Sequence, residues 1–154
     1  MITEDLLMRR IEIRKATKMD IPQLIELYYE LSSNENSIDL NEAITAYEKA
    51  ISSGVTYFVA DIGGKIVGSC YIALIPNITR QCRPIGFVEN VVVDSDYRRR
   101  GVGRKLMNAA TEYAKEQNCY KVTLQSGVKR EEAHKFYESV GFDGNSKRAF
   151  EIRF

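Results

Sequence analysis

The sequence is poor in the residues that build disulfide frameworks, metal centres and cysteine-based catalytic sites. Its 154 residues include three cysteines and one histidine. Cys70, Cys82 and Cys119 are an odd number without metal-ligand spacing, and no base partner is evident for any of them. We therefore expect free thiols in a reducing compartment, no metal cofactor and no cysteine nucleophile. The histidine, His134, lies in a predicted helix and is interpreted as a surface or packing residue.

A strong charge bias and long apolar runs are also missing. The formal net charge is +1, so no global electrostatic attraction to nucleic acid or to a membrane surface is expected. No stretch is apolar over the roughly 20 residues that a transmembrane helix needs. The first residues, MITEDLLMRR, include acidic side chains and no apolar run of signal-peptide length. These absences predict a cytoplasmic protein without a nucleic-acid or membrane partner.

Hydrophobic periodicity predicts a mixed α/β fold in a single domain that covers residues 1–154. Apolar spacing of three and four predicts helices, and alternation of apolar with polar residues predicts strands. A hairpin turn is expected at Gly63-Gly64, and a polar loop between Pro76 and Pro84. The expected helices are 21–31, with Asp20 as its N-cap, 41–52, 102–117 and 131–139. The expected strands are 11–16, 56–61, 65–75, 86–94, 120–125, one that starts at Phe142 and one over 148–154.

The most specific stretch runs from Gly86 to Met107 and reads GFVENVVVDSDYRRRGVGRKLM. Its first half has the β-branched and aromatic residues of a strand, and a polar turn, three arginines, two glycines and a helical pattern follow. A helix start offers unpaired N–H donors and the positive end of the helix dipole, and glycine lets a ligand approach the backbone closely. Arginine adds planar donors suited to phosphate. The stretch therefore predicts a site for an anionic group.

Two familiar phosphate-binding loops do not match this stretch. A Walker A loop ends in Gly-Lys-Ser or Gly-Lys-Thr, whereas this loop ends in Gly103-Arg104-Lys105. The dinucleotide-binding fingerprint needs a third glycine, and Leu106 occupies that place. Both nucleotide-binding interpretations are excluded.

The run Arg98-x-x-Gly101-x-Gly103 resembles the pyrophosphate loop of the GNAT superfamily of acetyl-CoA-dependent N-acetyltransferases. A second segment, Phe136–Phe142 (FYESVGF), is similar to the family pattern Phe-Tyr-x-x-x-Gly-Phe. The resemblance implies a mostly antiparallel, twisted mixed sheet with helices on both faces, whose strands splay apart at the cofactor site. It also implies acetyl-CoA as cofactor, coenzyme A as product, and a family-like order of elements over nearly the whole chain.

The resemblance also assigns roles to residues of these motifs. The central strand would hold the pantetheine arm through its backbone and polarise the acetyl carbonyl, and the glycine-containing loop would hold the pyrophosphate. The valine side chains themselves indicate only core packing. The implied cofactor-binding residues are Val91, Val92, Val93, Arg98, Arg99, Arg100, Gly101, Val102, Gly103 and Arg104.

Two further residues are candidates for catalysis. Tyr137 resembles the family tyrosine that protonates the thiolate of coenzyme A, and a phenol holds its proton at neutral pH. Glu89 is a carboxylate in an apolar strand, where it could take a proton from the attacking ammonium directly or through water. Two other roles of Glu89 remain possible from the sequence: it could be paired with a core arginine, or it could line the pocket without taking part in the chemistry. Strict alternation would place Glu89 on the face of Phe87 and Val91, and a bulge could alter this.

The expected reaction is direct acetyl transfer to the primary amine of a small molecule in a ternary complex. Relatives of this branch are often dimers, and the terminal strand is a candidate for exchange between two copies. Two alternatives remain. One is a peptide or protein N-acetyltransferase with an open groove, and the other is a non-catalytic acyl-CoA-binding module. The regions expected to shape the acceptor pocket offer polar residues to which no role is assigned: Tyr28, Tyr29, Glu30, Glu35, Asn77, Thr79, Arg80 and Arg83.

Overall fold

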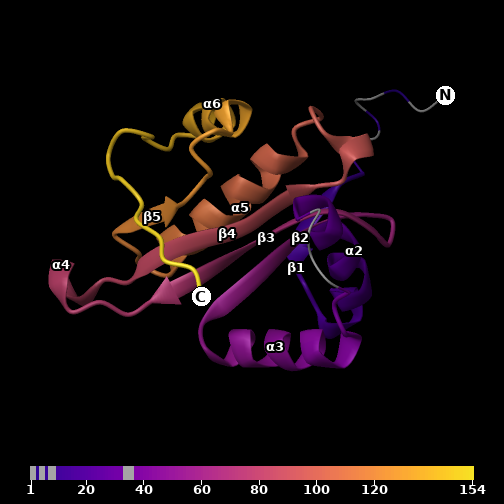
Figure 1. The fold of residues 1–154 in the computed structure, drawn as a ribbon, viewed down its shortest axis with the longest axis horizontal. Helices are drawn as coiled ribbons and strands as arrows, with labels where there is room; N and C mark the ends of the chain where they lie inside the picture. Colours follow the sequence, from indigo (N-terminus) through magenta and orange to yellow (C-terminus); the bar gives the residue numbers. More distant parts are fainter. Residues whose placement is uncertain (1–2, 4–5, 7–9, 33–36) are drawn as a thin grey trace.

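The computed structural model describes residues 3, 6, 10–32 and 37–154, and its centre is a twisted mixed sheet (Figure 1). In this part of the chain the sheet has five strands in the order β1-β2-β3-β4-β5. Strands β1 to β4 pair antiparallel, and β5 runs parallel to β4, which confirms the predicted fold class. The strands are β1 (Glu12–Lys15), β2 (Val55–Ile62), β3 (Lys65–Ile75), β4 (Ile85–Val93) and β5 (Lys121–Leu124).

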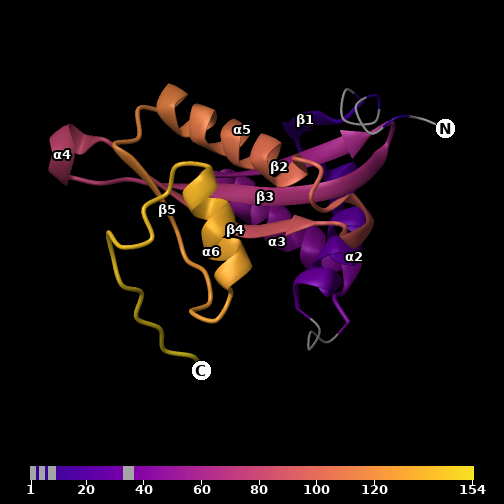
Figure 2. The same ribbon diagram turned by 90° about the horizontal axis from the view of Figure 1, so that it is seen from above.

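Helices cover both faces of the sheet (Figures 1 and 2). Helices α2 (Ile21–Leu31) and α3 (Leu40–Ser52) lie on one face, and α5 (Val102–Glu116) and α6 (Glu131–Ser139) lie on the other. The predicted ranges 21–31 and 131–139 agree with α2 and α6, and the other predicted helices and the first five predicted strands end within one residue of the observed ones. Of the helices in the described ranges, none is long and apolar enough to cross a bilayer.

The apolar sides of the helices bury two clusters of side chains, one on each face. On the α5 side the centre holds Ile72, Val88, Leu106 and Met107, each at most 1% exposed. On the opposite side α2 packs through residues such as Leu24 onto β3 and β4. The alternating pleat of β4 supplies side chains to both clusters, so this strand is held from both faces.

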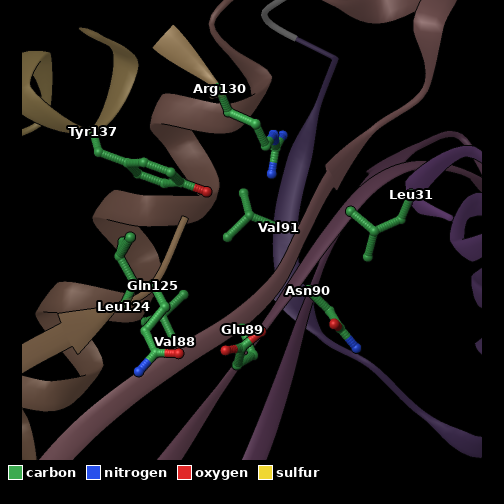
Figure 3. A pocket seen from close by; sticks show the side chains of 9 residues that line it. All are labelled: Leu31, Val88, Glu89, Asn90, Val91, Leu124, Gln125, Arg130 and Tyr137. Atoms are coloured by element: carbon green, nitrogen blue, oxygen red, sulfur yellow. The ribbon is translucent and has the colours of Figure 1, made fainter. Parts of the chain in front are cut away.

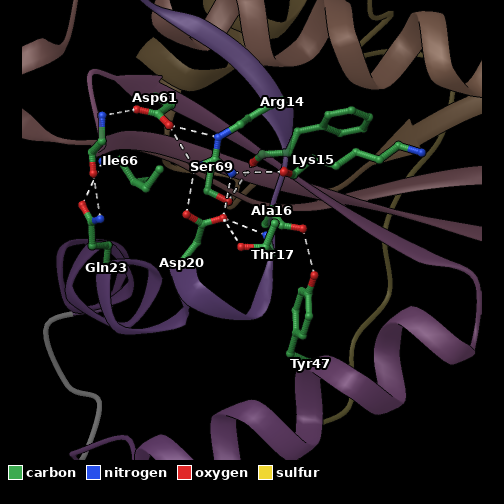
Figure 4. Close-up of polar contacts among 12 residues, drawn as sticks. Arg14, Lys15, Ala16, Thr17, Asp20, Gln23, Tyr47, Asp61, Ile66 and Ser69 are labelled. Atoms are coloured by element: carbon green, nitrogen blue, oxygen red, sulfur yellow. Dashed lines mark hydrogen bonds and ion pairs between the residues drawn. The ribbon is translucent and has the colours of Figure 1, made fainter.

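A paired charge network joins β1, β2 and the start of α2 (Figure 4). The two terminal nitrogens of Arg14 donate to the two carboxylate oxygens of Asp20 at 2.8 Å, and its Nε donates to Asp61 at 3.0 Å. The backbone N–H of Thr17 also donates to Asp20, at 2.7 Å. Asp20 stands at the expected N-cap position, but its carboxylate is used by this network and does not cap α2. The hydrogen bonds from Arg14 hold the pKa of Asp20 below its usual value, although burial opposes them.

A bulge in β4 changes which way its side chains point. Asn90 has a left-handed backbone with φ of 51°, and the register between β3 and β4 shifts beside it. Val88 and Val91, three residues apart, consequently pack into the same α5-side cluster. Glu89 pairs with Tyr71 of β3 and precedes the bulge, so the alternation expected between Glu89 and Val91 is broken. The bulge lies at the site described below.

The two strands predicted near the C-terminus are wrong. Residues 142–154 contain no strand, although the segment from Arg148 alternates apolar and polar side chains. Phe150, Ile152 and Phe154 are 87%, 82% and 117% exposed. A strand needs a hydrogen-bonded neighbour, and within this chain no described strand pairs with the segment.

The predicted polar loop 76–84 contains a short turn, α4 (Thr79–Cys82). Arg80, Gln81 and Cys82 have positive φ values of 55°, 60° and 58°, which side chains other than glycine rarely adopt. Arg83 follows the turn and donates to the backbone carbonyls of Asn118 and Cys119 at 3.2 and 2.9 Å. This loop lies at one end of the sheet, away from α2 (Figure 1).

Candidate active site

A cavity of about 230 Å³ lies where β4 and β5 separate. The two strands pair from Ile85 opposite Lys121 to Val88 opposite Leu124, and β4 continues to Val93 without a partner on this side. The separation makes room for a ligand beside the free edge of β4. Figure 3 shows side chains from α2, β4, β5, α6 and the β5–α6 loop around this space. The lining residues are Leu31, Val88, Glu89, Asn90, Val91, Leu124, Gln125, Arg130 and Tyr137.

Tyr137 enters the cavity from α6 with its hydroxyl pointing toward β4 (Figure 3). The ring of Phe142 packs edge-on against it with centroids 6.2 Å apart, which orients the side chain. Burial raises the pKa of Tyr137; the guanidinium of Arg130 opposes this effect and the carboxylate of Glu89 adds to it. A phenol with a raised pKa keeps its proton at neutral pH and is suited to act as a proton donor.

Glu89 reaches the same cavity from β4, directly before the bulge at Asn90. Its carboxylate makes no hydrogen bond or ion pair within the described ranges, so it is not held by a core arginine. The sequence alone left that arrangement open. Two candidate catalytic residues, 48 positions apart in the chain, thus line one cavity at the strand separation, from different elements.

The loop that leads into α5 has two left-handed residues and ends at a helix start. Arg99 and Gly101 have left-handed φ values of 59° and 78°, and the helix begins at Val102. Among the described residues, no acceptor is bonded to the backbone N–H groups of residues 99–104. Successive N–H groups that are free and lie at a helix start form a concave site for phosphate oxygens.

The arginines of this loop differ in how the fold uses them. Arg98 donates from Nε to the carbonyl of Val93 at 3.1 Å and from Nη2 to Glu30 at 3.3 Å. Glu30 also accepts from the backbone N–H of Ser95 at 3.0 Å, so this carboxylate of α2 anchors the loop. Arg104 donates to the carbonyl and the hydroxyl of Ser139, at 3.1 Å each. These two arginines position the loop through contacts with the rest of the fold.

Gly103 has a structural reason to lack a side chain. A Cβ at this position would lie 3.1 Å from Cζ of Phe136 on α6. The second glycine of the motif therefore allows α5 and α6 to approach closely, in addition to any role toward a ligand. The φ of Gly103 lies outside the left-handed region, in contrast to that of Gly101.

Arg130, Gln125 and Leu31 also line the cavity and were not predicted from the sequence. Arg130 lies before α6 at its N-cap, where its φ of −89° and ψ of 64° are not helical, so helical periodicity could not place its side chain. Leu31 and Gln125 also carry no local signal, because α2 and β5 meet at this cavity only through the tertiary fold. His134 does not line the cavity; its Nε2 lies 2.8 Å from the carbonyl oxygen of Gly127.

The polar residues considered for the acceptor side mostly serve the fold. Asn77 and Thr79 bond to each other, and Glu30 anchors the loop described above. The Tyr29 hydroxyl accepts from the backbone N–H of Ile38 at 2.9 Å. The Tyr28 hydroxyl is buried. None of the described candidates lines the cavity, and Glu35 lies outside the described residues.

The cysteines are not placed for nucleophilic chemistry. Cys70 and Cys119 are buried and Cys82 is exposed, all as free thiols. Burial raises the pKa of Cys70 to about 12 and that of Cys119 as well, so both remain protonated at neutral pH. None of the three lines the cavity.

Comparison with known proteins places this geometry in a family. The chain matches the family model described as the Acetyltransferase (GNAT) family over residues 15–142. A solved structure from Agrobacterium tumefaciens, provisionally described as an acetyltransferase, is 40% identical with a TM-score of 0.89, over 94% of this chain and 100% of that one. The crystal structure of glucosamine-6-phosphate N-acetyltransferase from Arabidopsis thaliana is 28% identical with a TM-score of 0.82, over 92% and 97% of the two chains.

Sequence relatives fall into more than one substrate class. The Glucosamine 6-phosphate N-acetyltransferase of Trypanosoma brucei brucei is 39% identical over 55% of this chain and 56% of its own length. The N-alpha-acetyltransferase 30 of Xenopus laevis is 32% identical over 55% of this chain and 30% of its own length. The match spans about half of the first relative and less than a third of the second.

Proposed function

The chain belongs to the acetyltransferase (GNAT) family, and we propose that it transfers an acetyl group from acetyl-CoA to the primary amine of a small molecule, directly and in a ternary complex. One observation carries the proposal. Glu89 and Tyr137 line one cavity at the separation of β4 and β5, and neither polar group is bonded within the described chain. A proton acceptor and a proton donor in one small cavity are what amine acetylation requires.

The residues present fit the cofactor of this family. The free N–H groups of residues 99–104 and the start of α5 suit a pyrophosphate, and Arg99 and Arg100 add positive charge. Beyond Val88 the β5-facing edge of β4 has no strand partner, so it can bond to the amides of a pantetheine arm. When bound, acetyl-CoA supplies the activated acetyl thioester. The residues proposed to hold it are Val91, Val92, Val93, Arg98, Arg99, Arg100, Gly101, Val102, Gly103 and Arg104.

Within this group, the proposed contacts are of two kinds. The side chain of Val92 is 5% exposed and packs on the α2 side of the sheet, so its contribution is its backbone. Arg98 and Arg104 contribute backbone N–H groups and charge while their side chains hold the loop in shape.

Glu89 and Tyr137 divide the proton transfers between them. The acceptor amine arrives as an ammonium, and the carboxylate of Glu89 takes its proton directly or through one water. Tyr137 holds a proton on its hydroxyl at neutral pH, because burial raises its pKa, and this proton is available to the departing thiolate. The backbone N–H groups of β4 beyond the bulge polarise the carbonyl that is attacked.

A thiol-release assay with acetyl-CoA tests the proposal. The panel contains amino sugars and their phosphates, amino acids, polyamines, aminoglycosides and short peptides. We expect turnover of one small-molecule class, and we expect Tyr137→Phe to lower kcat about 100-fold, the usual size of a general acid contribution. Tyr113→Phe is the matched control, since Tyr113 lies on α5 and does not line the cavity. An unchanged kcat in Tyr137→Phe would contradict the proposed role of this residue.

Peptide acetylation is the second candidate, because the matches include an N-alpha-acetyltransferase. A cavity of about 230 Å³ that contains Glu89 and Arg130 suits a small polar molecule better than an extended chain. Turnover of peptides alone in the same panel would favour this candidate. If the chain binds acetyl-CoA but acetylates no amine, and if Tyr137→Phe binds acetyl-CoA as tightly as the parent, a non-catalytic binding module is favoured.

We also propose that two copies of the chain form a homodimer. The segment 148–154 has alternating apolar side chains that are 82–117% exposed, and the outer edge of β5 has no partner in the described chain. An exposed strand edge and an unpaired apolar segment are complementary, so the segment of one copy pairs with β5 of the other. Light scattering should give twice the chain mass for the full chain and the single mass for a chain that ends at residue 147. Equal masses for the two forms would contradict this arrangement.

A further inference from the structure

Arg130 brings a positive charge into the cavity that holds Glu89. It stands at the N-cap position of α6 and lines the cavity together with Glu89 and Tyr137 (Figure 3). In the figure its guanidinium points into the space between Tyr137, Val91 and Leu31. Glu89 lies on β4 at the other end of this set of side chains. The cavity therefore has one cationic and one anionic group on different walls.

The guanidinium of Arg130 is not used by the fold. Within the described ranges it makes no hydrogen bond and no ion pair. Other arginines with structural roles are bonded within the fold: Arg14 binds two carboxylates, Arg83 binds two backbone carbonyls and Arg104 binds Ser139. A rigid fork of donors that points into a cavity without an acceptor is suited to an anionic ligand.

The loop between β5 and α6 sets the direction of this side chain. The carbonyl oxygen of Gly127 accepts from the backbone N–H of Arg130 at 3.0 Å and from Nε2 of His134 at 2.8 Å. The aliphatic part of Arg130 folds over Gly127, and a Cβ on this glycine would lie 3.6 Å from Cγ and Cδ of Arg130. Two hydrogen bonds and this packing therefore hold the base of the side chain, and only its charged end faces the cavity.

We propose that Arg130 is the anion-binding residue of the acceptor subsite, so that the acceptor carries a phosphate or a carboxylate in addition to its amine. This inference rests on the proposed function for the role of the cavity, and it narrows the substrate class. Glu89 receives the ammonium end and Arg130 receives the anionic end, each matched in charge. Gln125 also lines the cavity and offers a neutral donor and acceptor for hydroxyl groups of the acceptor.

Matched pairs of acceptors test the proposal. The first pair is glucosamine 6-phosphate and glucosamine; the second is an amino acid and its carboxamide. For each, kcat/KM is measured with the parent, with Arg130→Gln and with Arg130→Lys at saturating acetyl-CoA. We expect Arg130→Gln to lower kcat/KM about 10- to 100-fold for the charged member of the preferred pair, the usual effect of losing a charge-assisted hydrogen bond. The neutral member should change less than about threefold, and Arg130→Lys should restore part of the loss. The pair that shows the difference distinguishes phosphate from carboxylate.

Lys129→Gln is the matched control, because it removes the same charge from the neighbouring residue, which is exposed and does not line the cavity. It should leave both members of each pair unchanged. An equal loss for charged and neutral acceptors in Arg130→Gln, or a raised KM for acetyl-CoA alone, would overturn the proposal. Preference of the parent for polyamines or for neutral amines would overturn it while leaving the acetyltransferase activity intact.

A binding measurement separates this inference from the proposed function. Titration calorimetry of glucosamine 6-phosphate and of the amino acid, with coenzyme A present, needs no turnover. Binding of either that weakens at least tenfold in Arg130→Gln supports the anion subsite even if the panel shows no activity. Binding that is absent, or equal in parent and variant, rejects it even if a neutral amine is acetylated.

Discussion

The charge network at the start of α2 and the charged groups of the cavity beside β4 use charge in opposite ways. In the network at the start of α2, Arg14 donates to the carboxylates of Asp20 and Asp61 at 2.8–3.0 Å (Figure 4). In the cavity beside β4, Glu89 and Arg130 have no bonded partner in the described chain (Figure 3). Both places combine an arginine with a carboxylate, so the difference lies in the pairing: the network groups are bonded within the fold, and the cavity groups are left for a ligand in our proposal.

The contrast has a physical basis. A buried charge is costly unless it is paired, so the network stabilises the fold only because every donor meets an acceptor. In the cavity the groups are half-buried or exposed and remain solvated until a ligand displaces the water. Substitutions in the network should therefore change stability, and substitutions in the cavity should change activity.

Glu89→Gln gives the largest expected effect and tests the cavity side of the comparison. We expect kcat/KM for the amine to fall about 100-fold, because the amide cannot take a proton. The free energy of unfolding, measured by urea denaturation, should change by less than about 0.5 kcal/mol, because the carboxylate has no partner to lose. A large loss of stability with an unchanged rate would mean that Glu89 belongs with the structural charges.

Asp20→Asn tests the network side. The side chain of Asp20 is 8% exposed and receives a two-pronged bond from Arg14, so the substitution should lower the free energy of unfolding by about 2–3 kcal/mol. The kcat of the folded enzyme should stay within about twofold of the parent, since Asp20 is absent from the cavity. Glu112→Gln is the control: Glu112 forms an exposed pair with Lys115, and its loss should cost less than about 0.5 kcal/mol.

The same network predicts how stability depends on pH. The pKa of Asp20 is lowered from its usual value of 3.8, chiefly by Arg14, so the folded state binds this proton less readily than the unfolded state. The stabilisation is therefore complete above about pH 4 and is lost as the pH falls through the lower, folded pKa. Urea denaturation between pH 2 and pH 7 should show this loss in the parent. Asp20→Asn should show a shallower decline over the acid range, and an identical decline would contradict the assignment.

His134→Ala has the smallest expected effect and tests a residue that supports the cavity without lining it. His134 bonds the Gly127 carbonyl at 2.8 Å and thereby supports the loop that carries Arg130. Losing one hydrogen bond of about 1 kcal/mol should lower kcat/KM for the acceptor about fivefold, mainly through KM. The KM for acetyl-CoA should not change. An equal effect on both substrates would mean that His134 supports α6 as a whole.

Much of the fold could be predicted because its elements have strong local signals. The boundaries of α2 and α6 follow from apolar periodicity, and β3 follows the Gly63-Gly64 turn. The prediction of strands within residues 142–154 failed for a different reason. The segment from Arg148 alternates apolar and polar side chains as a strand does, but no described strand of the chain pairs with it. A periodic pattern indicates a preferred conformation, and only a partner makes it a strand.

The site was predictable in part for the same reason. Tyr137, Glu89 and the loop at Gly101 lie in motifs that are local in sequence. Arg130 was missed because a charged residue before a helix has many possible positions, and its direction depends on the contacts of Gly127 and His134. The structural roles of Gly103, which packs against α6, and of Glu30, which anchors the loop before α5, likewise depend on tertiary contacts.

The sequence by itself determined the order of the helices and of the first five strands, the glycine-containing loop before α5 and the family resemblance, because these depend on spacing along the chain. The tertiary structure alone decided that Asn90 forms a bulge, that β4 and β5 separate after Val88, and that Glu89, Arg130 and Tyr137 line one cavity without bonding to one another. These features depend on how distant segments pack, and short-range propensity contains no information about which polar groups are left without partners.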